Sequence, residues 1–135
     1  MSFFMSMIPP TITQQEHKVT IRNGRPIFYE PAELKAARRK LLDSVARFAP
    51  EKELTGPIRL TTKWIWPSGS EDYHWKTTKP DTDNLIKMLK DCMTRAGFWH
   101  DDAQVASEIT EKAEGPHPGI YVAIEELPLR RGYTK

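Results

Sequence analysis

The stretch from Lys79 to Asp102, KPDTDNLIKMLKDCMTRAGFWHDD, decides how the rest of the chain is organised. An apolar pattern with helical spacing fills its middle, and acidic residues stand at both ends of that pattern. Asp81 and Asp83 come just before it, and the adjacent pair Asp101 and Asp102 comes just after it. One acidic residue at a helix start is ordinary, because the helix dipole is positive there. This set is larger than helix capping requires.

Carboxylates of like charge repel one another, so a concentration of them is usually held together by a bound cation. Hard oxygen ligands of this kind suit Mg²⁺ or Mn²⁺. The stretch therefore indicates half of a metal site. A helix from Asp81 to about Arg95 would be roughly 21 Å long, so Asp102 begins at its far end. Either an extended run of chain brings Asp102 back, or a second subunit supplies the carboxylate; the sequence leaves both open.

The composition predicts one globular domain. The chain has 135 residues, of which 39% are hydrophobic and 28% are charged, which is typical of a folded soluble protein rather than a disordered one. We expect a single domain over residues 1–127 and a basic tail over 128–135. The apolar opening MSFFMSMI is too short to span a membrane. Cys92 is the single cysteine, which excludes an internal disulfide and favours the cytoplasm.

The two halves of the chain carry opposite charge. Residues 17–47 contain eight basic and three acidic residues, a net charge of +5, whereas residues 81–126 contain four basic and ten acidic residues, a net charge of −6. Two interpretations stay open. The halves are either two solvated faces of opposite sign, or a phosphate-binding half joined to a metal-binding half, as an enzyme acting on nucleic acid requires.

The remaining patterns predict an α+β fold with a small mixed β-sheet and two main helices. Asn23-Gly24 favours a tight hairpin turn. Alternation after residue 104 predicts two antiparallel strands that close the sheet. The strands are expected at 2–8, 19–22, 26–29, 58–66, 104–114 and 120–126, and the helices at 30–49 and 81–95.

Aromatic and basic residues alternate in the polar segment 68–79, which holds Tyr73, His74, Trp75, Lys76 and Lys79. Such a segment could stack on unpaired bases and touch phosphates, or it could be a plain connector. The arginines beside the hairpin turn are similarly either surface charges or phosphate contacts. The candidate DNA-binding residues are Lys18, Arg22, Arg25, Trp75, Lys76 and Lys79.

The motifs KPDTDNLIKMLKD and RAGFWHDDAQV together make the sequence resemble the RusA family of endodeoxyribonucleases, small phage-type resolvases of four-way DNA junctions. The resemblance implies that Asp81, Asp83 and Asp102 bind the catalytic divalent metal, with Asp101 as a further candidate ligand. It implies that Lys87 is needed for cleavage. From spacing alone, Lys87 would form an ordinary ion pair with Asp83, four residues earlier on the helix.

The resemblance further implies a RusA-like twofold homodimer that acts on branched DNA, with Mg²⁺ as cofactor and Mn²⁺ as a substitute. The reaction would be metal-assisted phosphodiester hydrolysis by paired symmetric nicks, leaving 5′-phosphate and 3′-hydroxyl ends. It points to a phage or prophage origin in a bacterial host. No glycine-rich phosphate loop is present, so we expect no nucleotide cofactor. The alternative function is a non-catalytic protein of the same fold that binds junctions or branched DNA.

Overall fold

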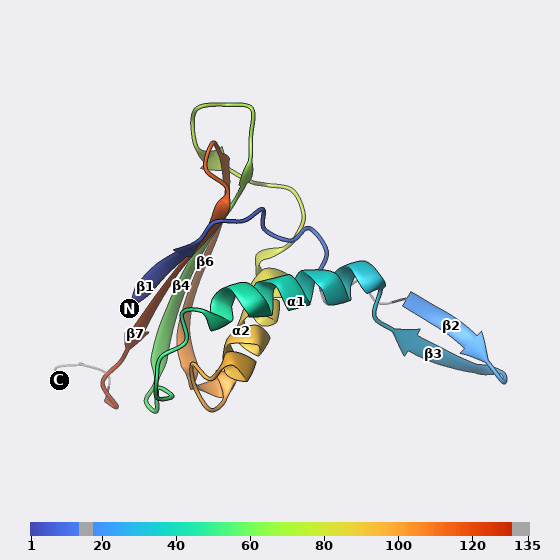
Figure 1. Cartoon of the computed structure of the whole chain (residues 1–135), viewed down its shortest axis with the longest axis horizontal. Coiled ribbons are helices and arrows are strands. Elements are labelled where there is room, and N and C mark those ends of the chain that lie inside the picture. The colour runs from blue at the N-terminus through green and yellow to red at the C-terminus, as the bar shows by residue number, and fades with distance from the viewer. Residues whose placement is uncertain (14–17, 131–135) are drawn as a thin grey trace.

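The structure is a computed structural model that describes residues 1–13 and 18–130. A five-stranded mixed sheet forms its body, and two helices lie against one face of that sheet (Figure 1). The sheet order is β1-β7-β4-β6-β5. The strands are β1 (Ser2–Met5), β4 (Ile58–Pro67), β5 (His74–Trp75), β6 (Val105–Gly115) and β7 (Gly119–Glu126). The α+β class with a mixed sheet and two helices is as the sequence predicted.

Strand β4 occupies the centre of the sheet, and one of its faces is buried along its whole length. Its alternating pattern buries every second residue beneath the helices, and the residues between them face the other side. Trp64 and Trp66 are both in the core, and Trp64 Nε1 donates a 2.8 Å hydrogen bond to Thr62 Oγ1. The helix-facing residues of β4 are Ile58, Leu60, Thr62, Trp64 and Trp66.

The last two strands run in opposite directions, as the sequence predicted, and a third strand lies between them. β6 and β7 are not neighbours; they flank β4, which pairs parallel with β6 and antiparallel with β7. Helix α2 (Thr82–Ala96) connects β4 to β6 and returns the chain to the end where β4 began, so β6 must run parallel to β4. Alternation in a strand indicates a pleated surface but does not choose the neighbouring strand, so the sequence did not place β4 between β6 and β7.

Both helices bury the stripes that their spacing indicated. Helix α1 (Ala32–Ala46) begins after Pro31 and buries Leu34, Leu41 and Val45. Helix α2 packs against α1 and β6 and ends at Gly97, whose φ of +88° is the left-handed conformation of a glycine C-cap. Helix α1 and strand β6 thereby fix the orientation of α2, and the predicted acidic site residues lie at or beyond its two ends.

The predicted hairpin forms, but it stands apart from the sheet. β2 (Lys18–Arg22) and β3 (Arg25–Tyr29) pair through a turn in which Asn23 has φ 52° and Gly24 has φ 73°. Both values are positive, as a type I′ turn requires. In Figure 1 the hairpin projects well beyond the far end of α1. It therefore forms an arm on the molecule rather than part of the core.

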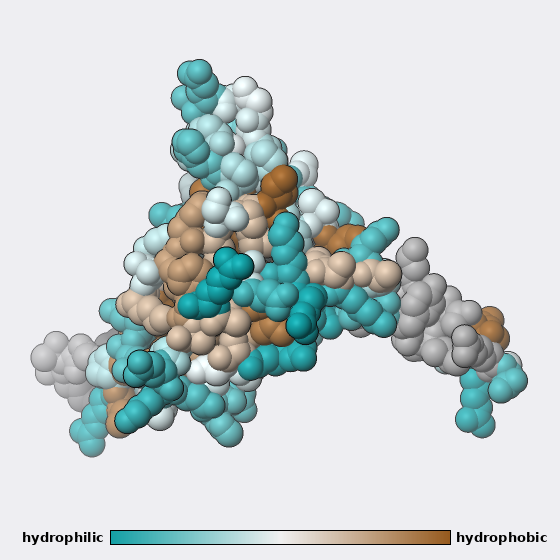
Figure 2. Space-filling view, in the orientation of Figure 1, coloured by the Kyte–Doolittle hydropathy of each residue, from teal (hydrophilic) through white to brown (hydrophobic). Residues whose placement is uncertain are grey.

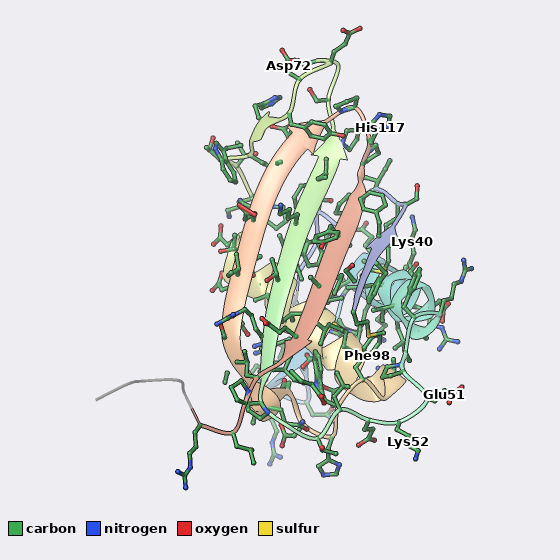
Figure 3. All side chains as sticks on the ribbon, turned by 90° about the vertical axis from the view of Figure 1, so that its left-hand side faces the viewer. Lys40, Glu51, Lys52, Asp72, Phe98 and His117 are labelled. Atoms are coloured by element: carbon green, nitrogen blue, oxygen red, sulfur yellow. The ribbon has the colours of Figure 1, made fainter. Side chains whose placement is uncertain are left out.

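Within the described ranges, no helix covers the second face of the sheet (Figure 3). Its charged side chains are partly neutralised by the ion pairs Lys63–Glu111 and Arg59–Glu125. On the side of the molecule shown in Figure 2, apolar groups gather near the middle, and hydrophilic groups dominate the loop above the sheet. Among the described residues, no helix is long and apolar enough to cross a membrane. The last five residues of the predicted tail, 131–135, lie outside the described part of the chain.

Candidate functional site

Asp81 and Asp83 lie together at the start of α2, where both are exposed. Asp81 is the N-cap residue, with extended backbone angles (φ −75°, ψ 149°), and its carbonyl oxygen accepts a 3.2 Å hydrogen bond from the Leu85 N–H. Its side chain makes no capping hydrogen bond. Neither carboxylate forms a hydrogen bond or an ion pair with any residue that the structure describes. Both are therefore available to an external cation.

A lysine on β6 fixes the segment that leads into these acids. Lys112 Nζ donates hydrogen bonds to the carbonyl oxygens of Thr78 (2.7 Å) and Pro80 (2.8 Å). The backbone N–H of Lys76 donates to the carbonyl oxygen of Lys112 at 3.1 Å. From the sequence, Lys112 was counted only as a charge. The alternation in β6 was a sequence signal that Lys112 and Glu111 face opposite sides of the sheet. In the structure, Lys112 pairs with Trp64 and faces the helices.

Lys87 lies on the same side of α2 as Asp83, one turn further along, and it is exposed. The ordinary ion pair between Asp83 and Lys87 does not form in the described structure. The neighbouring Lys90 instead forms the ion pair that ties α2 to Glu108 on β6. The ammonium group of Lys87 is therefore free to meet a ligand held at the start of α2.

Asp101 and Asp102 lie beyond the opposite end of α2, which is roughly 22 Å long at 15 residues. Asp101 caps the 3₁₀-helix η1 (Asp102–Gln104): its Oδ1 accepts a 2.9 Å hydrogen bond from the Ala103 N–H. Gln104 Oε1 accepts a 3.1 Å hydrogen bond from the Asp101 N–H, which completes a capping box. This structural role was not predicted from the sequence, although Asp followed three residues later by Gln is the expected signal.

Asp102 is half-buried and lines a surface hollow of about 490 Å³ together with Arg38, Asp91 and Arg95. Within the single chain, the structure brings Asp81 near Asp83 and Asp101 near Asp102, but it does not bring the two pairs together. The described residues contain no group of three or more His, Cys, Asp or Glu side chains placed to hold a metal ion.

The predicted DNA-binding residues fall into two groups. Trp75, Lys76 and Lys79 precede the acidic start of α2. Trp75 is 69% exposed, whereas Lys76 lies with its ammonium group 5.3 Å from the centroid of the Trp66 ring and donates to Thr78 Oγ1 at 2.9 Å. The second group belongs to the hairpin arm, where Arg25 is exposed beside the turn. For the remaining two, Lys18 and Arg22, the structure describes only their strand positions.

The protein is a small α+β protein. The start of α2, with Asp81 and Asp83, is held against the mixed sheet by Lys112. Residues 8–125 match the family model described as Endodeoxyribonuclease RusA, so the chain belongs to the RusA family, whose members are Holliday junction endodeoxyribonucleases. This confirms the family indicated by the motifs. The nucleases of this family are generally metal-dependent.

Two relatives span nearly the whole chain. It is 29% identical over 129 residues to an uncharacterized protein, YqaN, of Bacillus subtilis (strain 168), covering 86% of this chain and 90% of that protein. It is 26% identical over 119 residues to the crossover junction endodeoxyribonuclease rusA of Lactococcus phage r1t, covering 85% of this chain and 89% of the phage protein. The second relative is thus a phage protein that is named as an endodeoxyribonuclease.

Proposed function

We propose that this protein is a metal-dependent endodeoxyribonuclease that resolves four-way DNA junctions by paired symmetric nicks, leaving 5′-phosphate and 3′-hydroxyl ends. The observation that carries the proposal is the exposed start of α2, where Asp81 and Asp83 have no partner in the described structure and Lys87 follows on the same side. Family membership supplies the substrate class.

The donors at this helix start fit a hard divalent cation. Asp81 and Asp83 offer carboxylate oxygens, which Mg²⁺ and Mn²⁺ prefer, and no described group competes for them. When bound, Mg²⁺ would polarise the scissile phosphate and lower the pKa of a coordinated water. Lys87 directs its ammonium charge toward the phosphate oxygens, where negative charge develops during cleavage. Lys112 acts as a positioning residue, because it fixes Pro80 just before Asp81.

We place Asp102 in the same site through a twofold dimer. About 22 Å of helix separates it from Asp81 within one chain. A second copy whose Asp102 approaches the first copy's Asp81 and Asp83 completes the ligand set, and twofold symmetry then generates two such sites. Two symmetric sites suit paired cuts in strands of a four-way junction. Asp101 contributes to this site mainly by capping η1, which holds Asp102 in place.

Cationic groups on two elements would hold the DNA backbone. Lys76 and Lys79 precede the acidic helix start, and Arg25 stands at the end of the projecting hairpin arm, with Lys18 and Arg22 on the same arm. Lysine and arginine contacts to phosphates supply most of the sequence-independent affinity for DNA. Binding to a junction should therefore weaken steeply as the salt concentration rises.

The deciding experiment compares nicking of a labelled four-way junction with nicking of a linear duplex of matched sequence, in Mg²⁺ and in EDTA. The wild type should cut the junction symmetrically in Mg²⁺ alone, and Asp83→Asn should bind the junction without cutting it. A Glu33→Gln variant, exposed on α1 away from the site, serves as the matched carboxylate control and should cut normally. Junction binding by the wild type without cutting in any divalent metal would favour the non-catalytic binding protein.

A further inference from the structure

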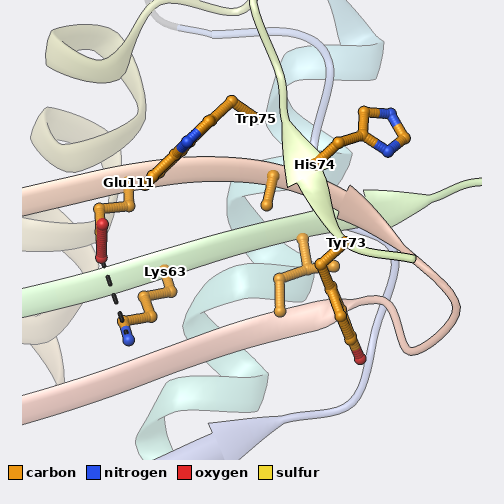
Figure 4. A pocket seen from close by; sticks show the side chains of 7 residues that line it. Lys63, Tyr73, His74, Trp75 and Glu111 are labelled. Carbon is orange, nitrogen blue, oxygen red and sulfur yellow. Dashed lines mark ion pairs between the residues drawn. The ribbon is translucent and has the colours of Figure 1, made fainter.

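A hollow of about 440 Å³ opens on the helix-free face of the sheet, at the edge formed by β5 and β6. Its walls include two aromatic side chains, Tyr73 and Trp75, which are 53% and 69% exposed. Ile65 and Ala113 also line it. Figure 4 looks onto this hollow, with the helices behind the strands and both aromatic side chains on the near face. Of the candidate site residues named above, Trp75 lines the hollow, whereas the four aspartates and Lys87 do not.

The strand pairing explains why the hollow exists. Trp75 on β5 pairs with Ala113 on β6, and Tyr73, two residues earlier, points to the same face. The Tyr73 ring lies directly on Gly115: a Cβ atom at that glycine would be 2.2 Å from the ring. Gly115 has no side chain, so the Tyr73 ring can lie against the strand there, and the small side chain of Ala113 leaves the hollow open beside Trp75.

The hollow also has a polar end. Lys63 Nζ lies 4.0 Å from Glu111 Oε1, and both residues line the hollow (Figure 4). Their exposure leaves hydrogen-bonding capacity on both groups, a donor on Lys63 and an acceptor on Glu111. A planar ligand with apolar faces and a hydrogen-bonding edge matches these features. A nucleobase has this chemistry, and exposed aromatic side chains are the usual platforms for unpaired bases.

We propose that this hollow stacks an unpaired nucleobase of the branched DNA substrate. This inference rests on the proposed function, and it adds a recognition site on the sheet face opposite to α2. The position of the hollow relative to Asp81 supports this proposal. Trp75 precedes Asp81 by six residues, so the two lie at most ~21 Å apart along the chain. A strand cut at the start of α2 can therefore reach the hollow around the β5 edge of the sheet.

Tryptophan fluorescence gives a direct test, because Trp75 is the exposed member of the four tryptophans; Trp64 and Trp99 are fully buried, and Trp66 is 4% exposed. The probes are a four-way junction with two unpaired thymines at the branch point and a fully paired linear duplex, both in EDTA so that no strand is cut. Junction binding should protect Trp75 from acrylamide quenching, and the duplex should protect it much less.

Variants separate stacking from a general loss of structure. Trp75→Ala should bind the thymine-bearing junction about ten-fold more weakly, and Trp75→Phe should retain most of the affinity because the aromatic platform remains. Ile109→Ala is the matched control: Ile109 is 47% exposed on the same face but does not line the hollow. Circular dichroism should show all three variants folded, since each changes an exposed side chain.

Two results would overturn the inference. The first is wild-type junction affinity in Trp75→Ala, or acrylamide quenching that the junction leaves unchanged. The second is a change in sedimentation of Trp75→Ala with no effect on DNA affinity, which would make this face a contact between protein copies. Nicking of the same junction in Mg²⁺ keeps the two proposals apart. Protection of Trp75 without cutting would refute only the nuclease function, and cutting without protection would refute only the base-stacking site.

Discussion

The ammonium group of Lys112 lies 2.8 Å from the carbonyl oxygen of Pro80, the residue that directly precedes Asp81. It is also 2.7 Å from the carbonyl oxygen of Thr78. One side chain of the sheet thus fixes both the segment before α2 and the position of the first candidate metal ligand. A charged donor makes such hydrogen bonds stronger than neutral donors do.

Replacing Lys112 should therefore impair cleavage more than folding. Lys112→Met leaves two carbonyl groups without their donor, so we expect a loss of about 1–2 kcal/mol in the free energy of unfolding, measured by urea denaturation. Nicking should fall by about ten-fold at saturating junction, with a higher Mg²⁺ requirement. Lys112→Arg should recover part of the activity. Lys52→Met, at an exposed turn, is the control and should behave as wild type; equal activity in Lys112→Met would remove its positioning role.

Asp101 offers a test of capping against metal binding. Asp101→Asn retains the side-chain oxygen that accepts the Ala103 N–H but removes the charge. If Asp101 mainly caps η1, Asp101→Asn should cut junctions normally, whereas Asp101→Ala should lower the free energy of unfolding by about 1 kcal/mol. Thermal unfolding and nicking in Mg²⁺ measure the two effects. Loss of cutting in a stable Asp101→Asn protein would show instead that the carboxylate charge is needed.

Lys87 should matter to chemistry and not to stability. It is exposed and has no ion pair in the described structure, so Lys87→Met should change the free energy of unfolding by less than about 0.5 kcal/mol. Nicking should fall by about 10²-fold while junction binding in EDTA persists. Lys90→Met is the matched control, because it breaks the pair with Glu108 and should cost stability rather than activity. A reversed pattern between these two lysines would contradict the assignment.

Mixed dimers test the shared site. A dimer of one Asp83→Asn subunit and one Asp102→Asn subunit contains one intact site if each site takes Asp102 from the opposite subunit. Mixing the two inactive proteins should then restore nicking of one junction strand. Mixing Asp81→Asn with Asp83→Asn is the control and should restore nothing, because either arrangement leaves a defect in both sites. Absence of rescue in the first mixture, with subunit exchange demonstrated, would place Asp102 in its own subunit's site.

Cys92 provides a pH-dependent property of the fold. Burial raises the pKa of its thiol from 9.0 to about 11, an effect partly offset by the nearby positive charge of Arg38. Between about pH 9 and 11 the unfolded chain loses the thiol proton while the folded chain keeps it, so the free energy of unfolding should fall as the pH rises. Urea denaturation at several pH values measures this fall, and Cys92→Ala should show less of it. Iodoacetamide should also modify native Cys92 slowly.

Local patterns predicted most of the secondary structure and indicated the family, although strand β5 lies in the segment 68–79 that was expected to be a polar loop. The alternation in residues 58–66, the apolar stripe of α2 and the Asn23-Gly24 turn each correspond to the observed element. Such patterns work because helix and strand periodicity reflect which side chains a single element can bury. The motifs around Asp81 and Asp102 were likewise sufficient to indicate the RusA family.

The order of strands and the distance between the two acidic groups were decided by the tertiary structure. β4 separates β6 from β7, and the length of α2 separates Asp81 at its start from Asp102, which lies beyond its other end in η1. Lys112 reaches Pro80 across 32 positions of sequence, and the hollow beside Trp75 depends on its pairing with Ala113. The sequence alone indicated the candidate side chains for metal binding and DNA binding. Which of them meet depends on contacts between residues far apart in the chain, and periodicity within one element carries no information about such contacts.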